Sequence, residues 1–131
     1  MPHTEYDVDV AVGFLNDHAT SQPHGHCAAF VRRALEAGGA VLSLSVADAK
    51  NYGPVLMASG FVQTSANEMF LPHKGDIAVI QPYQGSNTSG HIAMYNGTQW
   101  VSDFRQRDMW GGPGYRTNKP PYQLFRRQGD Q

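Results

Sequence analysis

The chain has 131 residues, a hydrophobic fraction of 40% and a formal charge of -1 at pH 7. This composition predicts one folded domain over residues 1–131 and argues against disorder. The near-neutral charge gives no electrostatic basis for nucleic-acid binding, and no apolar stretch approaches the roughly 20 residues of a membrane span. Because the chain has a single cysteine, an internal disulfide is excluded and packing must supply the stability.

The first part of the chain has the periodicity of amphipathic helices. A short helix is predicted over residues 8–18, where Val8, Val12 and Leu15 recur on one side. A second is predicted from Cys27 to Ala37, after a loop that contains Pro23 and Gly25. Its apolar stripe would be buried, and Gly38-Gly39 would end it as a left-handed cap.

A third helix is expected between Val46 and Ser59, with Ser45 as its N-cap. Gly53-Pro54 lies inside this span and should kink or split the helix. Farther on, the segment from Trp110 to Pro121 is rich in glycine and proline and is predicted to be a long loop.

The second half of the chain changes to the period of β-strands. Asn96-Gly97 between two β-rich runs is a strong hairpin signal. The expected strands are Asp76–Ile80, His91–Tyr95, Gln99–Phe104 and Tyr122–Arg126. Helices followed by antiparallel strands predict an α+β fold.

Cys27 stands where the polar loop passes into the second helix. A helix N-terminus presents unpaired N–H groups and a partial positive charge, and both favour a thiolate. We therefore expect Cys27 to be a nucleophile whose thiol pKa lies below the free value of about 8.5. His91, far along the chain at the start of a predicted strand, is the expected general base, as in cysteine hydrolases.

Asp103 is the candidate third member, twelve residues after His91 and across the Asn96-Gly97 turn. A three-residue loop would pair His91 with Asp103, so that the carboxylate could orient the imidazole. A two-residue loop would pair His91 with Ser102 and place Asp103 on the opposite face. The sequence leaves both registers open.

Three motifs resemble those of the NlpC/P60 and CHAP peptidoglycan hydrolases. They are the nucleophile-helix motif Gly25-His26-Cys27-Ala28-Ala29-Phe30-Val31, the strand start Gly75-Asp76-Ile77-Ala78-Val79 and the histidine strand Ser89-Gly90-His91-Ile92-Ala93-Met94-Tyr95. The resemblance covers roughly residues 8–126. It implies a papain-like α+β domain, with N-terminal helices on an antiparallel sheet, that cleaves an amide bond in the cell-wall peptide.

The chain resembles type VI secretion amidase effectors in its short length and in its lack of a signal peptide and of a wall-binding domain. A phage-type or prophage-derived lysin would have the same features. The first resemblance implies synthesis in the cytoplasm, action in the periplasm or on the wall of a target bacterium, and a cognate immunity protein as partner. No cofactor, nucleic-acid partner or membrane insertion is expected.

Other interpretations of these residues stay open. His24, His26 and Cys27, with His18 or His73, could form a zinc site, but strong zinc sites show spaced Cys/His pairs, so we expect no metal. His26, Trp110 and Tyr115 are candidates for substrate binding, although the two aromatic residues could equally anchor the long loop. A peptidoglycan-binding module without a reactive thiolate is a further alternative.

Overall fold

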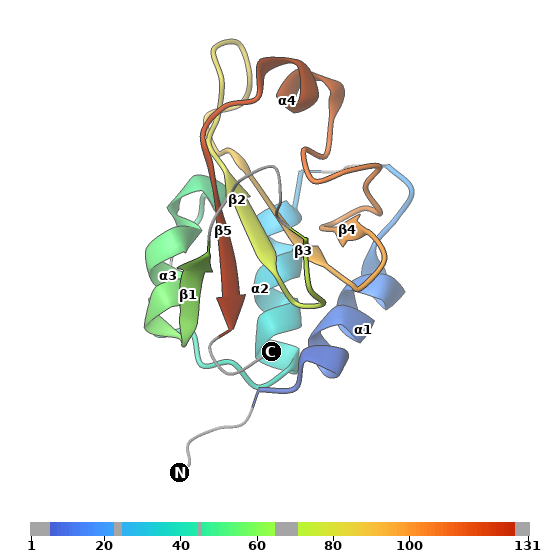
Figure 1. The fold of residues 1–131 in the computed structure, drawn as a ribbon, viewed down its shortest axis with the longest axis vertical. Helices are drawn as coiled ribbons and strands as arrows, with labels where there is room; N and C mark the ends of the chain where they lie inside the picture. Colours follow the sequence, from blue (N-terminus) through green and yellow to red (C-terminus); the bar gives the residue numbers. More distant parts are fainter. Residues whose placement is uncertain (1–5, 23–24, 45, 65–70, 128–131) are drawn as a thin grey trace.

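Five strands form one antiparallel sheet in a computed structural model that describes residues 6–22, 25–44, 46–64 and 71–127. The strand order is β1-β5-β2-β3-β4 (Figure 1). The strands are β1 (Phe61–Thr64), β2 (Ile77–Ile80), β3 (His91–Tyr95), β4 (Trp100–Val101) and β5 (Tyr122–Arg127). β5, the last strand in the sequence, lies between β1 and β2 and pairs with both. This part of the sheet can therefore form only when the C-terminal strand is in place.

The N-terminal helices cover one face of this sheet, which confirms the predicted α+β architecture (Figure 1). α1 (Val8–His18) and α2 (Cys27–Ala37) have the bounds that the periodicity predicted. The Asp7 carboxylate caps α1 by accepting the backbone N–H groups of Asp9 and Val10. Gly39, at φ 102°, takes the left-handed position after α2, whereas Gly38 stays right-handed.

Alternation along the strands builds the core. The helix-facing cluster combines residues of the helices with every second residue of the central strands, including Leu15, Val31, Leu35, Ile77, Val79, Ile92, Met94 and Phe125. The opposite face carries a smaller cluster of Ala78, Ala93, Trp100 and Leu124. Complete burial of an aliphatic side chain stabilises a fold by about 1.5–3 kcal/mol. Because the helix-facing cluster contains several such side chains from α2 and β3, their packing holds α2 against β3.

The third predicted helix differs from expectation at its start. A 3₁₀ turn, η1 (Ala49–Asn51), leads into α3 (Tyr52–Ala58). Gly53-Pro54 therefore lies in the first turn of α3 and does not split a longer helix, because a first-turn residue needs no N–H for an intrahelical bond. The expected N-cap, Ser45, lies outside the described residues.

Two other elements were missed. Strand β1 follows α3 directly, and a short helix, α4 (Pro113–Asn118), lies within the predicted loop Trp110–Pro121. Pro113 occupies the first position of α4, where its missing N–H is tolerated. Glycine and proline in this segment thus start a helix rather than prevent one.

The β3–β4 hairpin has neither of the two registers expected from its sequence. Tyr95 pairs with Trp100, so the loop contains four residues. The Asn96 side chain accepts the N–H groups of Thr98 and Gln99, while its backbone N–H donates to the Gln99 carbonyl. These bonds include Gln99 in the turn, which shifts the ladder by one residue and removes the predicted pairing of His91 with Asp103.

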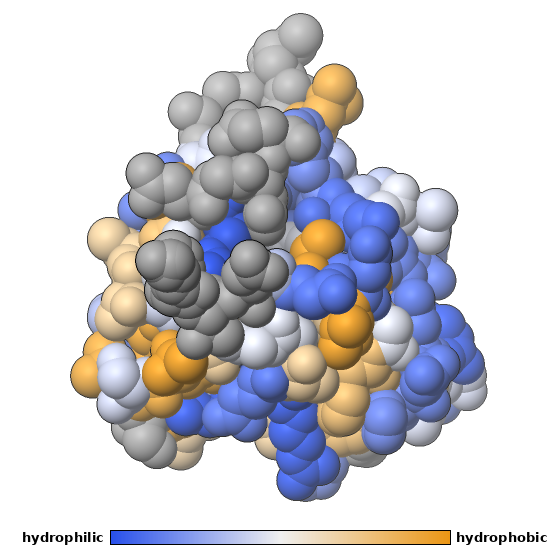
Figure 2. Space-filling view, turned by 90° about the horizontal axis from the view of Figure 1, so that it is seen from below, coloured by the Kyte–Doolittle hydropathy of each residue, from blue (hydrophilic) through white to orange (hydrophobic). Residues whose placement is uncertain are grey.

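The outer surface is mainly polar on the face that Figure 2 shows, where apolar residues lie in separate patches among hydrophilic ones. Among the described residues, no helix has the length and apolar character needed to cross a lipid bilayer.

Candidate active site

Cys27 is the first residue of α2, as the sequence predicted. Gly25, at φ 80°, turns the chain immediately before the helix, a conformation that favours glycine. The sulfur lies beside the start of β3, because the backbone N–H of Ile92 interacts with it, together with those of Ala28 and Cys27 itself. The fold therefore brings Cys27 next to the peptide that follows His91.

His91 is buried, with 9% of its surface exposed, and its Nε2 lies 2.7 Å from Oε1 of Gln106. The Gln106 amide nitrogen donates to the carbonyl oxygens of Asp108 and Met109, which only accept hydrogen bonds. The amide oxygen must then face His91, so Nε2 carries the proton in the neutral ring. Nδ1 is left as the acceptor nitrogen.

A tight reversal after β4 explains why Gln106 reaches the imidazole. Val101 bridges to Arg105 across residues 102–104, and the Gln106 N–H donates to the Trp100 carbonyl. The chain thus folds back on β4 and does not continue along β3. Gln106 was not recognised in the sequence, because a neutral amide in a polar run carries no spacing signal.

Asp103 lies at the tip of this reversal and faces the start of α2. Its Oδ2 accepts the backbone N–H of His26 at 2.8 Å, and its Oδ1 lies 3.3 Å from the Ser102 hydroxyl. The carboxylate is 1% exposed. It is close enough for its charge to act on both Cys27 and His91, so Asp103 remains part of the site by electrostatics even though the predicted hairpin pairing is wrong.

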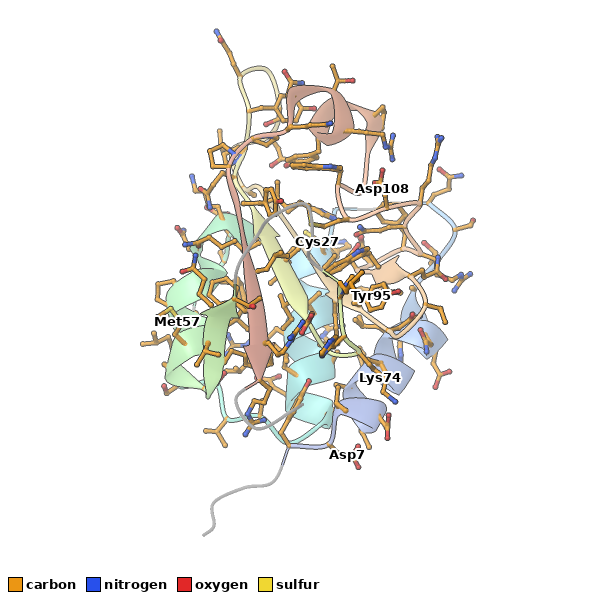
Figure 3. All side chains as sticks on the ribbon, in the orientation of Figure 1. Asp7, Cys27, Met57, Lys74, Tyr95 and Asp108 are labelled. Atoms are coloured by element: carbon orange, nitrogen blue, oxygen red, sulfur yellow. The ribbon has the colours of Figure 1, made fainter. Side chains whose placement is uncertain are left out.

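These residues line a cleft of about 560 Å³, which we call the Cys27 cleft. The lining includes Cys27, His91, Asp103 and Phe104, together with Tyr83 and residues Gly111–Tyr115. We call residues 108–118 the α4 segment; in Figure 3 it lies beyond the Cys27 end of α2. The lining thus combines a thiol, an imidazole and several aromatic rings in one cleft.

The three candidates for substrate binding are placed differently. Tyr115 lines the Cys27 cleft, with its ring centroid 5.8 Å from that of His91. Trp110 packs edge-on against Tyr122 at 5.2 Å, and the cleft lining does not include it. His26, at the N-cap of α2, has an exposed side chain beside the cleft. The alternative zinc cluster includes His24, which lies outside the described residues; within the described ranges, no group of three or more His, Cys, Asp or Glu side chains could hold a metal ion.

Burial controls the protonation of the two central residues. Desolvation raises the pKa of the Cys27 thiol, and the Asp103 charge raises it further, against the opposing backbone N–H groups. The expected lowering of this pKa is therefore wrong for the enclosed site. Burial also lowers the pKa of His91, with Gln106 and Asp103 acting in the other direction. Both shifts favour the uncharged form of the group concerned.

Comparison with solved structures identifies relatives of this fold. A chain of the type VI native effector–immunity complex Tae3–Tai3 from Ralstonia pickettii aligns with a TM-score of 0.84 and 39% identity, over 94% of this chain and 100% of its own length. The chain belongs to the Tae3 family of type VI effectors. A selenomethionine form of the same complex gives a TM-score of 0.79 and 39% identity, over 88% of this chain and 98% of that one.

No protein-family model and no curated protein matches this Tae3-family sequence. The resemblance to NlpC/P60 and CHAP hydrolases therefore stays a prediction from three motifs. The solved relatives support the observed architecture, in which helices pack on a five-stranded antiparallel sheet. They also assign the chain to an effector family.

Proposed function

We propose that this Tae3-family protein is a cysteine amidase that cleaves an amide bond in the stem peptide or cross-bridge of peptidoglycan. The observation that carries the proposal is that Cys27 and His91 line one cleft while Gln106 engages Nε2 of His91. With the proton held on Nε2, Nδ1 is the ring nitrogen left to accept the thiol proton. A thiol and an oriented imidazole acceptor in one cleft are the requirements of nucleophilic amide cleavage.

The proposed reaction begins with attack of the Cys27 sulfur on the scissile carbonyl carbon. The thiol proton passes to Nδ1 of His91 as the S–C bond forms, since the neutral pair favours transfer during attack. His91 then gives that proton to the leaving amine as the C–N bond breaks, which leaves a thioester. Water attacks the thioester with His91 as the base, the acid product departs, and the Cys27 thiol is restored.

The roles of the neighbouring groups follow from their contacts. Gln106 accepts from Nε2 in every protonation state and so keeps the ring in place. The buried Asp103 charge favours the imidazolium that forms when His91 takes a proton. His26 and Tyr115 are proposed to contact the substrate, and Trp110 to support the α4 segment through Tyr122.

The family membership supports a biological setting for this chemistry. We propose an antibacterial effector that is delivered by type VI secretion, acts on the cell wall of a target bacterium in its periplasm and is inhibited by a cognate immunity protein. The solved relatives are effector–immunity complexes, which is the basis for expecting such a partner.

Mass spectrometry of purified muropeptides, after digestion with the wild type and with Cys27→Ala, tests the proposal. The wild type should release new amine and carboxyl termini at one bond, and Cys27→Ala should release none. Alanine is a good helix former at this first-turn position, so circular dichroism should show an unchanged fold. Equal product from both proteins would exclude Cys27 as the nucleophile, and intact muropeptides with the wild type would favour a binding module.

A further inference from the structure

The hydroxyl group of Tyr115 is buried, and among the described residues its proton has no acceptor. Native proteins leave few buried polar groups unpaired, and such groups often belong to functional sites. Tyr115 lines the Cys27 cleft, and it interacts electrostatically with Cys27. Tyr115 therefore borders the cleft in which a substrate carbonyl would have to meet the sulfur.

The surroundings leave the phenol as a donor. Asn87 approaches the hydroxyl, but its side-chain oxygen already accepts the N–H groups of Ser89 and Gly90. Only the Asn87 amide N–H groups can thus face Tyr115, and these donate to its oxygen without using its proton. Burial raises the pKa of Tyr115 to about 12, so the hydroxyl keeps its proton over the whole neutral range.

Three other donors of the cleft lining are already engaged. The Ser89 hydroxyl donates to Asp48, and Nε2 of His91 donates to Gln106. The Gly111 N–H donates to Asp108. The backbone N–H of Cys27 belongs to the first turn of α2 and has no intrahelical acceptor. It can serve as one donor to a developing oxyanion, and a second donor is needed for a complete site.

We propose that Tyr115 is a catalytic residue whose hydroxyl donates a hydrogen bond to the oxygen of the scissile carbonyl as that oxygen becomes negative. This role rests on the proposed amidase function and adds the second oxyanion donor to it. The donor comes from the α4 segment, whose residues Gly111–Tyr115 line the same cleft as Cys27 and His91.

Contacts within and around the α4 segment can hold the Tyr115 side chain in place. Arg116, one residue after Tyr115, contacts the Asp108 carboxylate at 2.6 and 3.2 Å. The same carboxylate accepts the N–H groups of Trp110 and Gly111. On the other side, the Tyr83 hydroxyl occupies the place where a side chain at Gly114 would begin. These contacts hold the ring of Tyr115 across from His91.

The test is Tyr115→Phe, which keeps the ring and removes only the hydroxyl. With muropeptides as substrate, kcat should fall about 100-fold, the usual cost of losing one oxyanion donor, and KM should change less than two-fold. Alkylation of Cys27 by iodoacetamide should keep its rate, because that displacement develops no carbonyl oxyanion. Tyr122→Phe, a phenol outside the cleft lining, is the matched control and should leave all three quantities unchanged.

Two results would overturn the inference while leaving the amidase function intact. One is a kcat for Tyr115→Phe within three-fold of an active wild type. The other is a loss of kcat matched by an equal loss of alkylation rate, which would mean that the phenol acts by positioning Cys27 and His91. Inactivity of the wild type on the same muropeptides would instead reject the proposed function itself.

Discussion

The Asp103 carboxylate accepts the backbone N–H of His26 at 2.8 Å, immediately before the helix that begins with Cys27. A buried anion thus occupies the positive end of α2, where a helix N-terminus favours negative charge. A thiolate on Cys27 would have to share that position with a like charge. Burial is the larger cause of the raised thiol pKa, and this like charge adds to it, so the helix start does not by itself make Cys27 acidic.

Asp103→Asn should therefore increase the acidity of Cys27. Loss of the carboxylate charge lowers the thiol pKa, so the inflection in a plot of iodoacetamide alkylation rate against pH should move downward. Hydrolysis should nevertheless slow by about 10-fold, because the imidazolium formed on His91 loses a nearby negative charge. Single-turnover rates on muropeptides would measure this loss.

Ser102→Ala is the control for that experiment. The Ser102 hydroxyl contacts the same carboxylate at 3.3 Å, but its removal leaves the charge in place. The alkylation inflection should then stay close to that of the wild type. An unchanged or higher inflection in Asp103→Asn would contradict the electrostatic role assigned to Asp103.

Gln106 offers a second pH experiment. Gln106→Glu keeps an acceptor at Nε2 of His91 and adds a negative charge, so the pKa of His91 should rise and the acid limb of kcat/KM should move to higher pH. Gln106→Ala leaves a buried N–H unpaired, which costs about 1–3 kcal/mol, and frees the ring, so kcat should fall on the order of 100-fold. An acid limb that stays in place in Gln106→Glu would argue against direct contact in solution.

Two adjacent glycines, Gly111 and Gly112, give a steric test of the contact between His91 and Gln106. A Cβ on Gly111 would lie 2.6 Å from Nε2 of His91 and 3.1 Å from the Gln106 amide nitrogen, at a φ of 82°. Gly111→Ala should therefore displace the imidazole, lower activity at least 10-fold and reduce the melting temperature. Gly112 is extended, at φ -174°, and a Cβ there meets nothing within 4 Å. Equal losses in Gly111→Ala and Gly112→Ala would contradict this arrangement.

The pKa shifts of His91 and Cys27 should also affect how the stability of the protein depends on pH. His91 has a lowered pKa, so below its ordinary value of about 6.5 the unfolded chain binds more protons and stability falls as pH falls. Cys27 has a raised pKa, so above about 8.5 the unfolded thiol ionises first and stability falls as pH rises. Melting temperatures of His91→Gln and Cys27→Ala, compared with wild type, should lack the acid and the alkaline loss respectively.

Local sequence signals were sufficient to predict the two N-terminal helices and the elements that carry Cys27 and His91. The helical periodicity of residues 8–18 and 27–37 gives both helices with their observed bounds, because each buries one stripe on the sheet. The position of Cys27 at a helix start and of His91 at a strand start follows from the same patterns. The pairing of distant strands, such as β5 between β1 and β2, has no such local signal.

The orientation of His91 depended on details that periodicity does not encode. One side chain, Asn96, lengthens the hairpin loop through its own hydrogen bonds, and this changes the register. The reversal at residues 102–104 then sends Asp103 toward α2 and Gln106 toward the imidazole. The lowered thiol pKa failed as a prediction for a related reason: the sequence marks a helix N-terminus but not the burial and the carboxylate that oppose it.

A lone, enclosed thiol with a raised pKa also determines how the protein withstands oxidants. Peroxides react with thiolates, and a chain with one cysteine has no second thiol to trap a sulfenic acid as an internal disulfide. Oxidation of Cys27 could therefore proceed to irreversible acids. Because burial raises the thiol pKa, the resting site should contain little thiolate, and the first oxidation step at Cys27 should be slow.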